Sequence, residues 1–296
     1  MSGRGAPLLA LVLLLAVGCG GGEAPVADLA ARPTEVLLAY PEFRDVEVRF
    51  VPRVPLAELG ERPSVFVHLL ELPGSVVRTF DYPVPATWQV AEPAVDAVRL
   101  HQSALAPPLP EGEYQLTVGL YDAATGVRFP LAGGRGEADE NEYVVATVRV
   151  PASAGPLPRF EYSPEWLETE GSPDRQIVAT RWLGAAAGSV RVSQLAAGGV
   201  LHAQLYVPPG PEPGAHFAVV PDERGPVAVL RSTCSPEELV LSGAGRHWLE
   251  WRVPEGAEVC DLDFGVNFLF VGGRGEQRRS VRLEVLAWQP PSAAGR

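Results

Sequence analysis

Lysine is absent from this 296-residue chain, so all 24 of its basic residues are arginine. We interpret this bias as a property of the coding sequence and attach no function to it. Cations are also outnumbered, because 36 acidic residues give a formal net charge of −12. Nucleic-acid-binding proteins cluster cations against phosphates, so this composition argues against nucleic acid as a partner.

Sequence motifs of catalytic and metal sites are missing as well. The five histidines form no HExxH pair, and the chain has no GxSxG turn, Walker loop or CxxC pair. His68 lies in an apolar run, where we expect a structural imidazole. The carboxylates at 137–142 lack the spacing of a calcium loop, so we expect a solvated acidic turn there. We therefore predict no catalytic residues, no metal and no cofactor, while distant side chains could still converge in the fold.

The first half of the chain has no segment with the apolar periodicity of a helix. Glycines and prolines punctuate it instead, 31 and 30 in the whole chain. Short runs such as "DVEVRFVPRV" at 45–54 alternate polar and apolar residues, which is typical of half-buried strands. Each such strand has one apolar face, and two sheets bury those faces against each other. We predict an all-β chain with two tandem antiparallel β-sandwiches, one immunoglobulin-like and one jelly-roll-like.

The apolar run "APLLALVLLLAV" at 6–17 is too short to span a bilayer as a stable helix. It follows Arg4 and leads through small residues to Cys19, which is the layout of a secretory signal. The segment "LAVGC" at 15–19 also resembles the lipobox of bacterial lipoproteins, although Ala16 stands where leucine is usual. In such proteins a peptidase cuts before the cysteine, whose thiol carries diacylglycerol. The alternatives are a plain signal peptide cut nearby and an uncleaved anchor.

This resemblance implies membrane lipid as a partner, because several acyl chains attached to Cys19 would anchor the protein stably in the bilayer. The implied location is the bacterial cell envelope. Gly20 follows the cysteine where an inner-membrane retention signal would place aspartate, which favours the outer membrane or cell surface.

The predicted organisation follows from these segments and from the Pro/Gly-rich joint "PASAGPLPRF" at 151–160. Its parts are a signal peptide at 1–18, a flexible tether at 19–33, a first sandwich at 34–151, a linker at 152–160, a second sandwich at 161–290 and a tail at 291–296.

The first sandwich carries a family resemblance over residues 65–131. Its strand pair "VFVHL…D" and hairpin "EGEYQLTVGLYDAATGVR" are similar to soluble β-sandwich modules appended to bacterial membrane glycosyltransferases of the protein-mannosyltransferase type. The matching residues are Phe66, His68, Asp81, Trp88, Gly112, Tyr114, Gly119, Tyr121, Asp122, Gly126 and Arg128. The start of the second sandwich has a weaker likeness to a second module that is found in the same kind of proteins. The resemblance implies a fold and no activity, because such modules are not the catalytic part.

Two cysteines remain after Cys19, and an exported compartment permits them to pair. A disulfide between Cys234 and Cys260 would close a loop of 26 residues. The alternative is two separate buried thiols that act as small hydrophobes.

Tryptophan offers the best clue to a ligand, because a flat ring complements the apolar face of a pyranose. Trp182, Trp248 and Trp251 of the second sandwich are the candidate ligand-binding residues. Trp248 and Trp251 are three apart, so in one regular strand they point to opposite faces and at most one lies in the core. The alternative is that the tryptophans fill the cores or the domain joint.

Three functions are compatible with these patterns. The first is a non-catalytic, membrane-anchored structural or interaction module. The second is a carbohydrate-binding accessory protein of the cell envelope, with a glycan or an envelope protein as partner. The third is a hydrolase whose site is assembled from distant residues, for which a histidine and two carboxylates would have to converge in one pocket.

Replacing Cys19 with alanine removes the thiol that would carry the lipid. We expect the variant to leave the membrane fraction or to remain unprocessed, as read by cell fractionation and by the mass of the mature N-terminus. Normal processing together with membrane retention of this variant would contradict the lipoprotein prediction.

Overall fold

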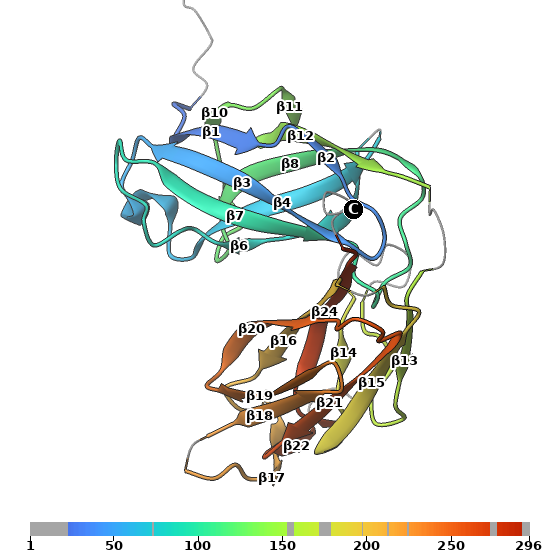
Figure 1. The fold of residues 1–296 in the computed structure, drawn as a ribbon. Coiled ribbons are helices and arrows are strands. Elements are labelled where there is room, and N and C mark those ends of the chain that lie inside the picture. Colours follow the sequence, from blue (N-terminus) through green and yellow to red (C-terminus); the bar gives the residue numbers. More distant parts are fainter. Residues whose placement is uncertain are drawn as a thin grey trace, which may run out of the picture.

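The computed structural model describes residues 23–72, 74–152, 157–171, 179–196, 198–211, 213–223, 225–272 and 277–291. Within these ranges the chain consists of strands and loops, apart from one short 3-10 helix, η1 (Leu56–Leu59). Figure 1 shows the strands gathered into two bodies, one from each half of the chain. The predicted all-β sandwich fold is confirmed, whereas the immunoglobulin-like and jelly-roll-like assignments stay predictions.

Two sheets form the first sandwich and bury their apolar faces in one core. The smaller sheet has the order β10-β1-β3-β7, made of β1 (Ala27–Arg32), β3 (Phe43–Pro52), β7 (Ala94–His101) and β10 (Leu131–Gly133). The larger sheet contains β2 (Glu35–Leu37), β4 (Pro63–Glu71), β5 (Ser75–Thr79), β6 (Tyr82–Pro83), β8 (Gly112–Asp122), β9 (Arg128–Phe129), β11 (Glu137–Asp139) and β12 (Glu142–Val150). In β3 the buried Val46, Val48 and Phe50 alternate with exposed polar residues, as the period of two predicts.

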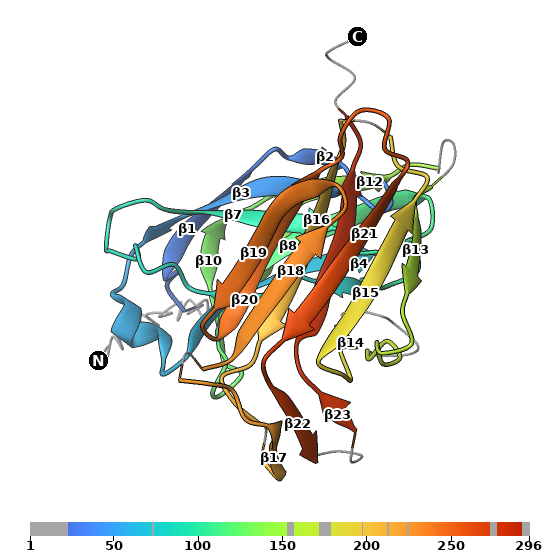
Figure 2. The same cartoon turned by 60° about the horizontal axis from the view of Figure 1, so that its bottom comes forward.

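The second sandwich is built in the same way around a separate core. One sheet has the order β13-β15-β21-β18-β19, made of β13 (Arg159–Tyr162), β15 (Ala187–Ser193), β18 (Val227–Ser232), β19 (Ser235–Ser242) and β21 (Val259–Val266). The other has the order β14-β24-β16-β20, made of β14 (Arg181–Trp182), β16 (Val200–Val207), β20 (Gly245–Arg252) and β24 (Arg282–Gln289). At one end of this body lies a small sheet of β17 (Ala215–Val219), β22 (Leu269–Gly272) and β23 (Arg278–Arg279) (Figure 2).

Two predicted connecting segments contain strands. β1 lies inside the predicted tether at 19–33, and β13 begins at Arg159, inside the predicted linker at 152–160. The sequence "ADLAAR" of β1 has no β-branched or aromatic residue, so it carries little strand signal of its own. Its strand forms because β3 and β10 pair with it on either side and because Ala27 and Leu29 enter the core. Cys19 and the predicted signal peptide lie outside the described residues.

The segment between β7 and β8 joins the two sandwiches. Leu105 and Ala106, which belong to the first half of the chain, are buried in the core of the second sandwich. The Ala104 N–H donates to the carbonyl of Leu286 on β24 at 2.7 Å, and the Leu286 N–H donates to Ser103 Oγ at 3.1 Å. In Figure 1 β24 runs up to this junction. The sandwiches therefore meet through shared apolar burial as well as through hydrogen bonds to the backbone of Leu286.

No helix in the described part of the chain has the length and apolar character required to cross a membrane.

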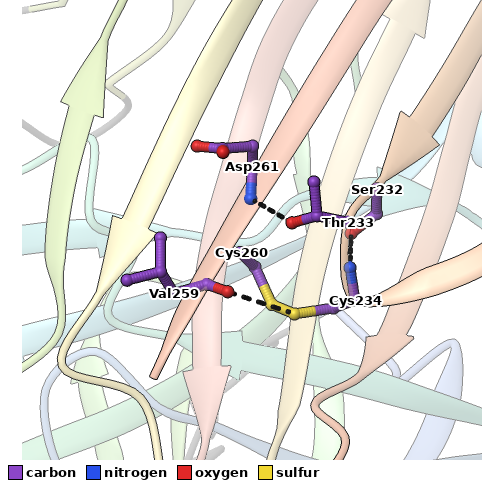
Figure 3. The surroundings of a disulfide bond; sticks show 6 residues. All are labelled: Ser232, Thr233, Cys234, Val259, Cys260 and Asp261. Carbon is purple, nitrogen blue, oxygen red and sulfur yellow. Dashed lines mark hydrogen bonds between the residues drawn. A yellow bond between two sulfur atoms is a disulfide. The ribbon is translucent and has the colours of Figure 1, made fainter. Parts of the chain in front are cut away.

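The structure joins Cys234 and Cys260 in the disulfide that the sequence predicts (Figure 3). Cys234 lies at the turn between β18 and β19, and Cys260 lies in the neighbouring strand β21, with a Cα–Cα distance of 5.4 Å. Hydrogen bonds from Cys234 N–H to Ser232 Oγ and from Asp261 N–H to Thr233 Oγ1 hold the turn beside β21. Because both sulfurs are buried, the bond links the turn to the core of the second sandwich.

Replacing Cys234 and Cys260 together with alanine releases a loop of 26 residues in the unfolded chain. We expect the free energy of unfolding to fall by about 2–4 kcal/mol, measured by chemical denaturation of exported protein. Reduced wild-type protein is the control and should lose a similar amount. Equal stability of the oxidised wild type and the double variant, or two free thiols by mass spectrometry in non-reduced material, would contradict the structural role of this bond.

Candidate functional site

A pocket of about 630 Å³ lies where the two sandwiches meet. The first sandwich lines it with residues 78–83, which include β6, and with the second half of β7. The second sandwich lines it with side chains from β16, β20 and β24. The lining includes the arginines Arg78, Arg99, Arg246 and Arg282, the carboxylates Asp81, Asp96, Glu170 and Glu284, and the side chains of Tyr82, His101, Gln204 and Trp248.

Arg99 on β7 connects the two sandwiches beside this pocket. Its guanidinium donates to both carboxylate oxygens of Asp45, at 2.9 and 3.1 Å, and lies 3.6 Å from Glu250 of the second sandwich. The hydrogen bond with Asp45 is the main cause that raises the pKa of Arg99 above its usual value. The same guanidinium lies 4.5 Å from the ring centre of Phe43 and 5.1 Å from that of Trp248. These contacts position the indole of Trp248 against the first sandwich.

Trp248 is the tryptophan that keeps substantial contact with solvent, with 40% of its surface exposed. In the amide orientation that satisfies both partners, Gln204 accepts from Trp248 Nε1 at 3.0 Å and donates to Glu284 at 3.2 Å. Burial alternates along β20, so that Trp248 faces outward and Trp251 faces the core. The prediction that these two rings point to opposite faces is confirmed.

Trp182 and Trp251, the other two tryptophans predicted to bind a ligand, are core residues. They are 2% and 1% exposed, because large rings on the inward face of a strand bury a large apolar area in the core. Trp182 Nε1 donates to Glu170 at 3.1 Å, and Arg282 lies 5.1 Å from its ring centre, on the pocket side. Trp182 and Trp251 therefore fill the core, which is the alternative that the sequence leaves open, and Trp248 is the one of the three candidates that stands at the pocket.

Two polar atoms of the pocket lining have no hydrogen-bond partner among the described residues. They are Tyr82 Oη and His101 Nδ1, and both are shielded from solvent. A buried polar atom without a partner costs about 1–3 kcal/mol. Burial, helped by the charges of Arg78 and Arg99, lowers the pKa of His101 to about 4, so the imidazole is neutral at pH 7. Burial also raises the pKa of Tyr82, which keeps its hydroxyl protonated.

The charges of the lining balance. Arg78, Arg99, Arg246 and Arg282 face Asp81, Asp96, Glu170 and Glu284, so the formal charges sum to zero. Glu284 accepts from Arg246 at 2.6 Å and from Arg282 at 2.5 Å. Arg78 donates to the backbone carbonyls of Val77 and Pro107. The guanidinium groups are thus engaged by the protein itself, and sequence reasoning missed this arrangement because its members come from both sandwiches.

A second cluster surrounds His68, outside this pocket. His68 Nδ1 lies 3.0 Å from Glu142 Oε1, Thr117 Oγ1 donates to the same oxygen at 2.6 Å, and Arg128 lies 3.4 Å from Glu142 Oε2. Asp81 lies 3.9 Å from His68 Nε2, so a histidine and two carboxylates do converge. Of these residues only Asp81 also lines the pocket between the sandwiches.

The ionisation of Glu142 reflects these contacts. Burial by itself would raise the pKa of Glu142, but the hydrogen bonds with His68 and Thr117 and the charges of His68 and Arg128 hold it below its usual value. Glu142 is buried, so the prediction of a solvated acidic turn at 137–142 is wrong for this residue. The other carboxylates of that run are exposed.

The motif residues of the first sandwich have evident structural roles. The ring of Phe66 stacks on His68 and covers Gly119, where a Cβ would overlap the ring. Arg128 lies 4.8 Å from the Phe66 ring centre, on the same patch. Asp122 accepts from Arg62 N–H, Ala124 N–H and Thr125 Oγ1, which closes the "DAATG" turn. The motif therefore describes how this sheet packs and turns.

Metal ligands do not gather in the described residues, where no group of three or more His, Cys, Asp or Glu side chains could hold an ion.

Comparisons with known proteins give no family for this chain. No protein-family model matches it, and no curated protein matches it. Among solved structures, Salmonella alpha-2-macroglobulin reacted with methylamine is 14% identical over 91% of this chain, with a TM-score of 0.24. This chain spans 15% of the length of that protein. The YadV chaperone is 10% identical over 86% of this chain and 99% of its own, with a TM-score of 0.21. At these TM-scores neither likeness supports an inference about function.

Replacing Glu142 with glutamine removes the charge at the centre of the His68 cluster. We expect the free energy of unfolding at pH 7 to fall by about 1–3 kcal/mol, because a buried charge-assisted hydrogen-bond network is broken. The pKa of Glu142 is lower in the folded protein, so its contribution is present at neutral pH and is lost as the pH falls below 4.5, the value for the unfolded chain. The acid side of the stability–pH curve should therefore flatten in this variant.

The matched control for this prediction is Glu140→Gln, an exposed carboxylate of the same turn. Its unfolding free energy should stay within about 0.5 kcal/mol of the wild type at every pH. Equal behaviour of the two variants would show that the buried network contributes nothing to stability.

Proposed function

We propose that this protein is an exported lipoprotein of the bacterial cell envelope that acts without catalysis, as a binding module held at the membrane by acylated Cys19. The leader and lipobox-like segment support the anchor, and Gly20 favours the outer membrane or the cell surface. The body that follows would then present its surfaces to the space beyond that membrane.

The observation that carries the binding role is the joint between the sandwiches. Leu105 and Ala106 of the first half enter the core of the second sandwich, and hydrogen bonds of Ser103 Oγ and Ala104 N–H with the backbone of Leu286 reinforce the contact. A joint of this kind holds side chains from both sandwiches around one pocket. Binding sites occur preferentially at such domain interfaces.

Carbohydrate binding is the second candidate function, and Trp248 favours it. The ring is 40% exposed and stands in a pocket whose other lining residues include Asp96, Arg99 and Gln204. Carbohydrate sites combine an aromatic face for the apolar side of a sugar with hydrogen-bonding side chains at the edge. An envelope protein as partner is the alternative.

A glycan array combined with a broad screen of hydrolase substrates tests both functions on the full chain. We expect no turnover, and we expect saturable glycan binding that Trp248→Ala weakens about tenfold or more, since the variant loses the aromatic contact. Val240→Ala, which trims an exposed side chain of the other sheet, is the control and should bind like the wild type. Turnover that disappears on mutation of His68, Glu142 or Asp81 would overturn the non-catalytic function.

A further inference from the structure

We propose that the pocket between the two sandwiches binds an uncharged, hydroxyl-rich ligand such as a pyranoside, with Tyr82 and His101 as its polar anchors. The inference rests on the proposed function in taking the protein as a binding module. It adds the two polar anchors and the uncharged character of the ligand to the carbohydrate site at Trp248, and it does not depend on the anchor at Cys19.

The two anchors are distinguished by their unmet hydrogen-bonding capacity. Tyr82 Oη and His101 Nδ1 are buried, lack a partner among the described residues and belong to side chains that line the pocket. Tyr162 Oη and Trp251 Nε1 share this state in the described chain, whereas His202 Nδ1, also without a hydrogen bond, has Glu250 Oε1 at 3.1 Å; none of these residues lines the pocket. Buried polar atoms are normally satisfied, so two in the lining of one pocket point to a ligand that supplies the missing bonds.

The chemistry of the anchors selects the ligand's polar groups. A phenol can donate and accept one hydrogen bond, and a neutral imidazole donates through one nitrogen and accepts through the other. His101 is neutral near pH 7 because burial and the neighbouring arginines lower its pKa to about 4. A hydroxyl group, which also donates and accepts, can satisfy both anchors without bringing a charge into the pocket.

The surrounding charges disfavour an ionic ligand. Four arginines and four carboxylates of the lining balance formally. Arg99 is held by both oxygens of Asp45, and Arg246 and Arg282 share Glu284. An anion would have to displace a carboxylate from Arg99, Arg246 or Arg282, and a cation at Glu284 would have to compete with two guanidinium groups for that carboxylate.

The remaining part of the lining suits the apolar side of a sugar ring. Trp248 provides an indole that is 40% exposed, and Gln204, bonded to its Nε1, provides an amide beside it. Trp248 stands on β20 of the second sandwich, while Tyr82 and His101 stand on β6 and β7 of the first. A ligand between them would touch both bodies, so its binding would depend on the joint.

The decisive comparison uses two tyrosines, each of which has a buried hydroxyl without a hydrogen-bond partner in the described part of the chain. Tyr82→Phe removes a hydroxyl in the pocket, and Tyr162→Phe removes one outside it. The probes are arrays of uncharged oligosaccharides and of matched sialylated and uronic acid-containing ones, followed by calorimetric titration of the uncharged oligosaccharide that binds best. The full chain should be kept in a detergent without a sugar headgroup, because a glycosidic detergent would compete for the site.

We expect Tyr82→Phe to weaken binding of the uncharged oligosaccharide about three- to tenfold, the loss of one hydrogen bond. Its melting temperature should stay equal or rise, because the variant removes an unsatisfied buried group. Tyr162→Phe should leave the affinity unchanged. A purely structural tyrosine would lower the melting temperature together with the affinity.

Three outcomes would overturn the inference: no saturable binding of any uncharged oligosaccharide, binding confined to the charged ones, or equal affinities of the wild type and Tyr82→Phe. Membrane retention of the wild type, set against release of Cys19→Ala, is read separately by cell fractionation before detergent is added. A failed ligand inference is therefore distinguishable from a failed anchor.

Discussion

The contact of residues 103–106 with β24 is the interaction on which the arrangement of the two sandwiches depends. This segment follows β7 of the first sandwich, yet Leu105 and Ala106 complete the core of the second. Ser103 and Ala104 bond both backbone groups of Leu286 at the same place. Apolar burial supplies the driving force, and the hydrogen bonds set the register of the contact. Separation of the two bodies would expose this apolar surface and leave Leu286 without these partners.

The pocket exists because of this contact, since its walls belong to different bodies. β6 and β7 come from the first sandwich, and β16, β20 and β24 come from the second. Arg99 also connects the two sandwiches at the pocket, because its guanidinium lies between Asp45 and Glu250 and over the ring of Trp248. The rotamer of the one exposed tryptophan is thus coupled to an ion pair across the joint.

The sequence predicts much of the fold and little of the pocket, for physical reasons. Alternation in β3 and β20 reports local burial, so it indicates strands and places Trp248 and Trp251 on opposite faces. β1 could not be predicted in this way, because its alanines have little preference for strands and because the strand depends on pairing with distant segments. The pocket could not be predicted from the sequence for a related reason. Tyr82 lies in a strand of two residues beside prolines, and its relation to Trp248, far away in the chain, is created by the joint.

The motif of the first sandwich consists of residues that, with one exception, differ from those that line the pocket, and this separation bears on function. Phe66 stacks its ring on His68, Gly119 leaves room for that ring, and Asp122 closes a turn. All three roles are requirements of the sheet itself. Of the motif residues, only Asp81 also lines the pocket, while Tyr82, His101 and Trp248 lie outside the motif. A fold can host many functions because sites are built from side chains that the fold does not require. Under the proposed function, ligand affinity therefore follows the identities of those three residues and not those of the motif.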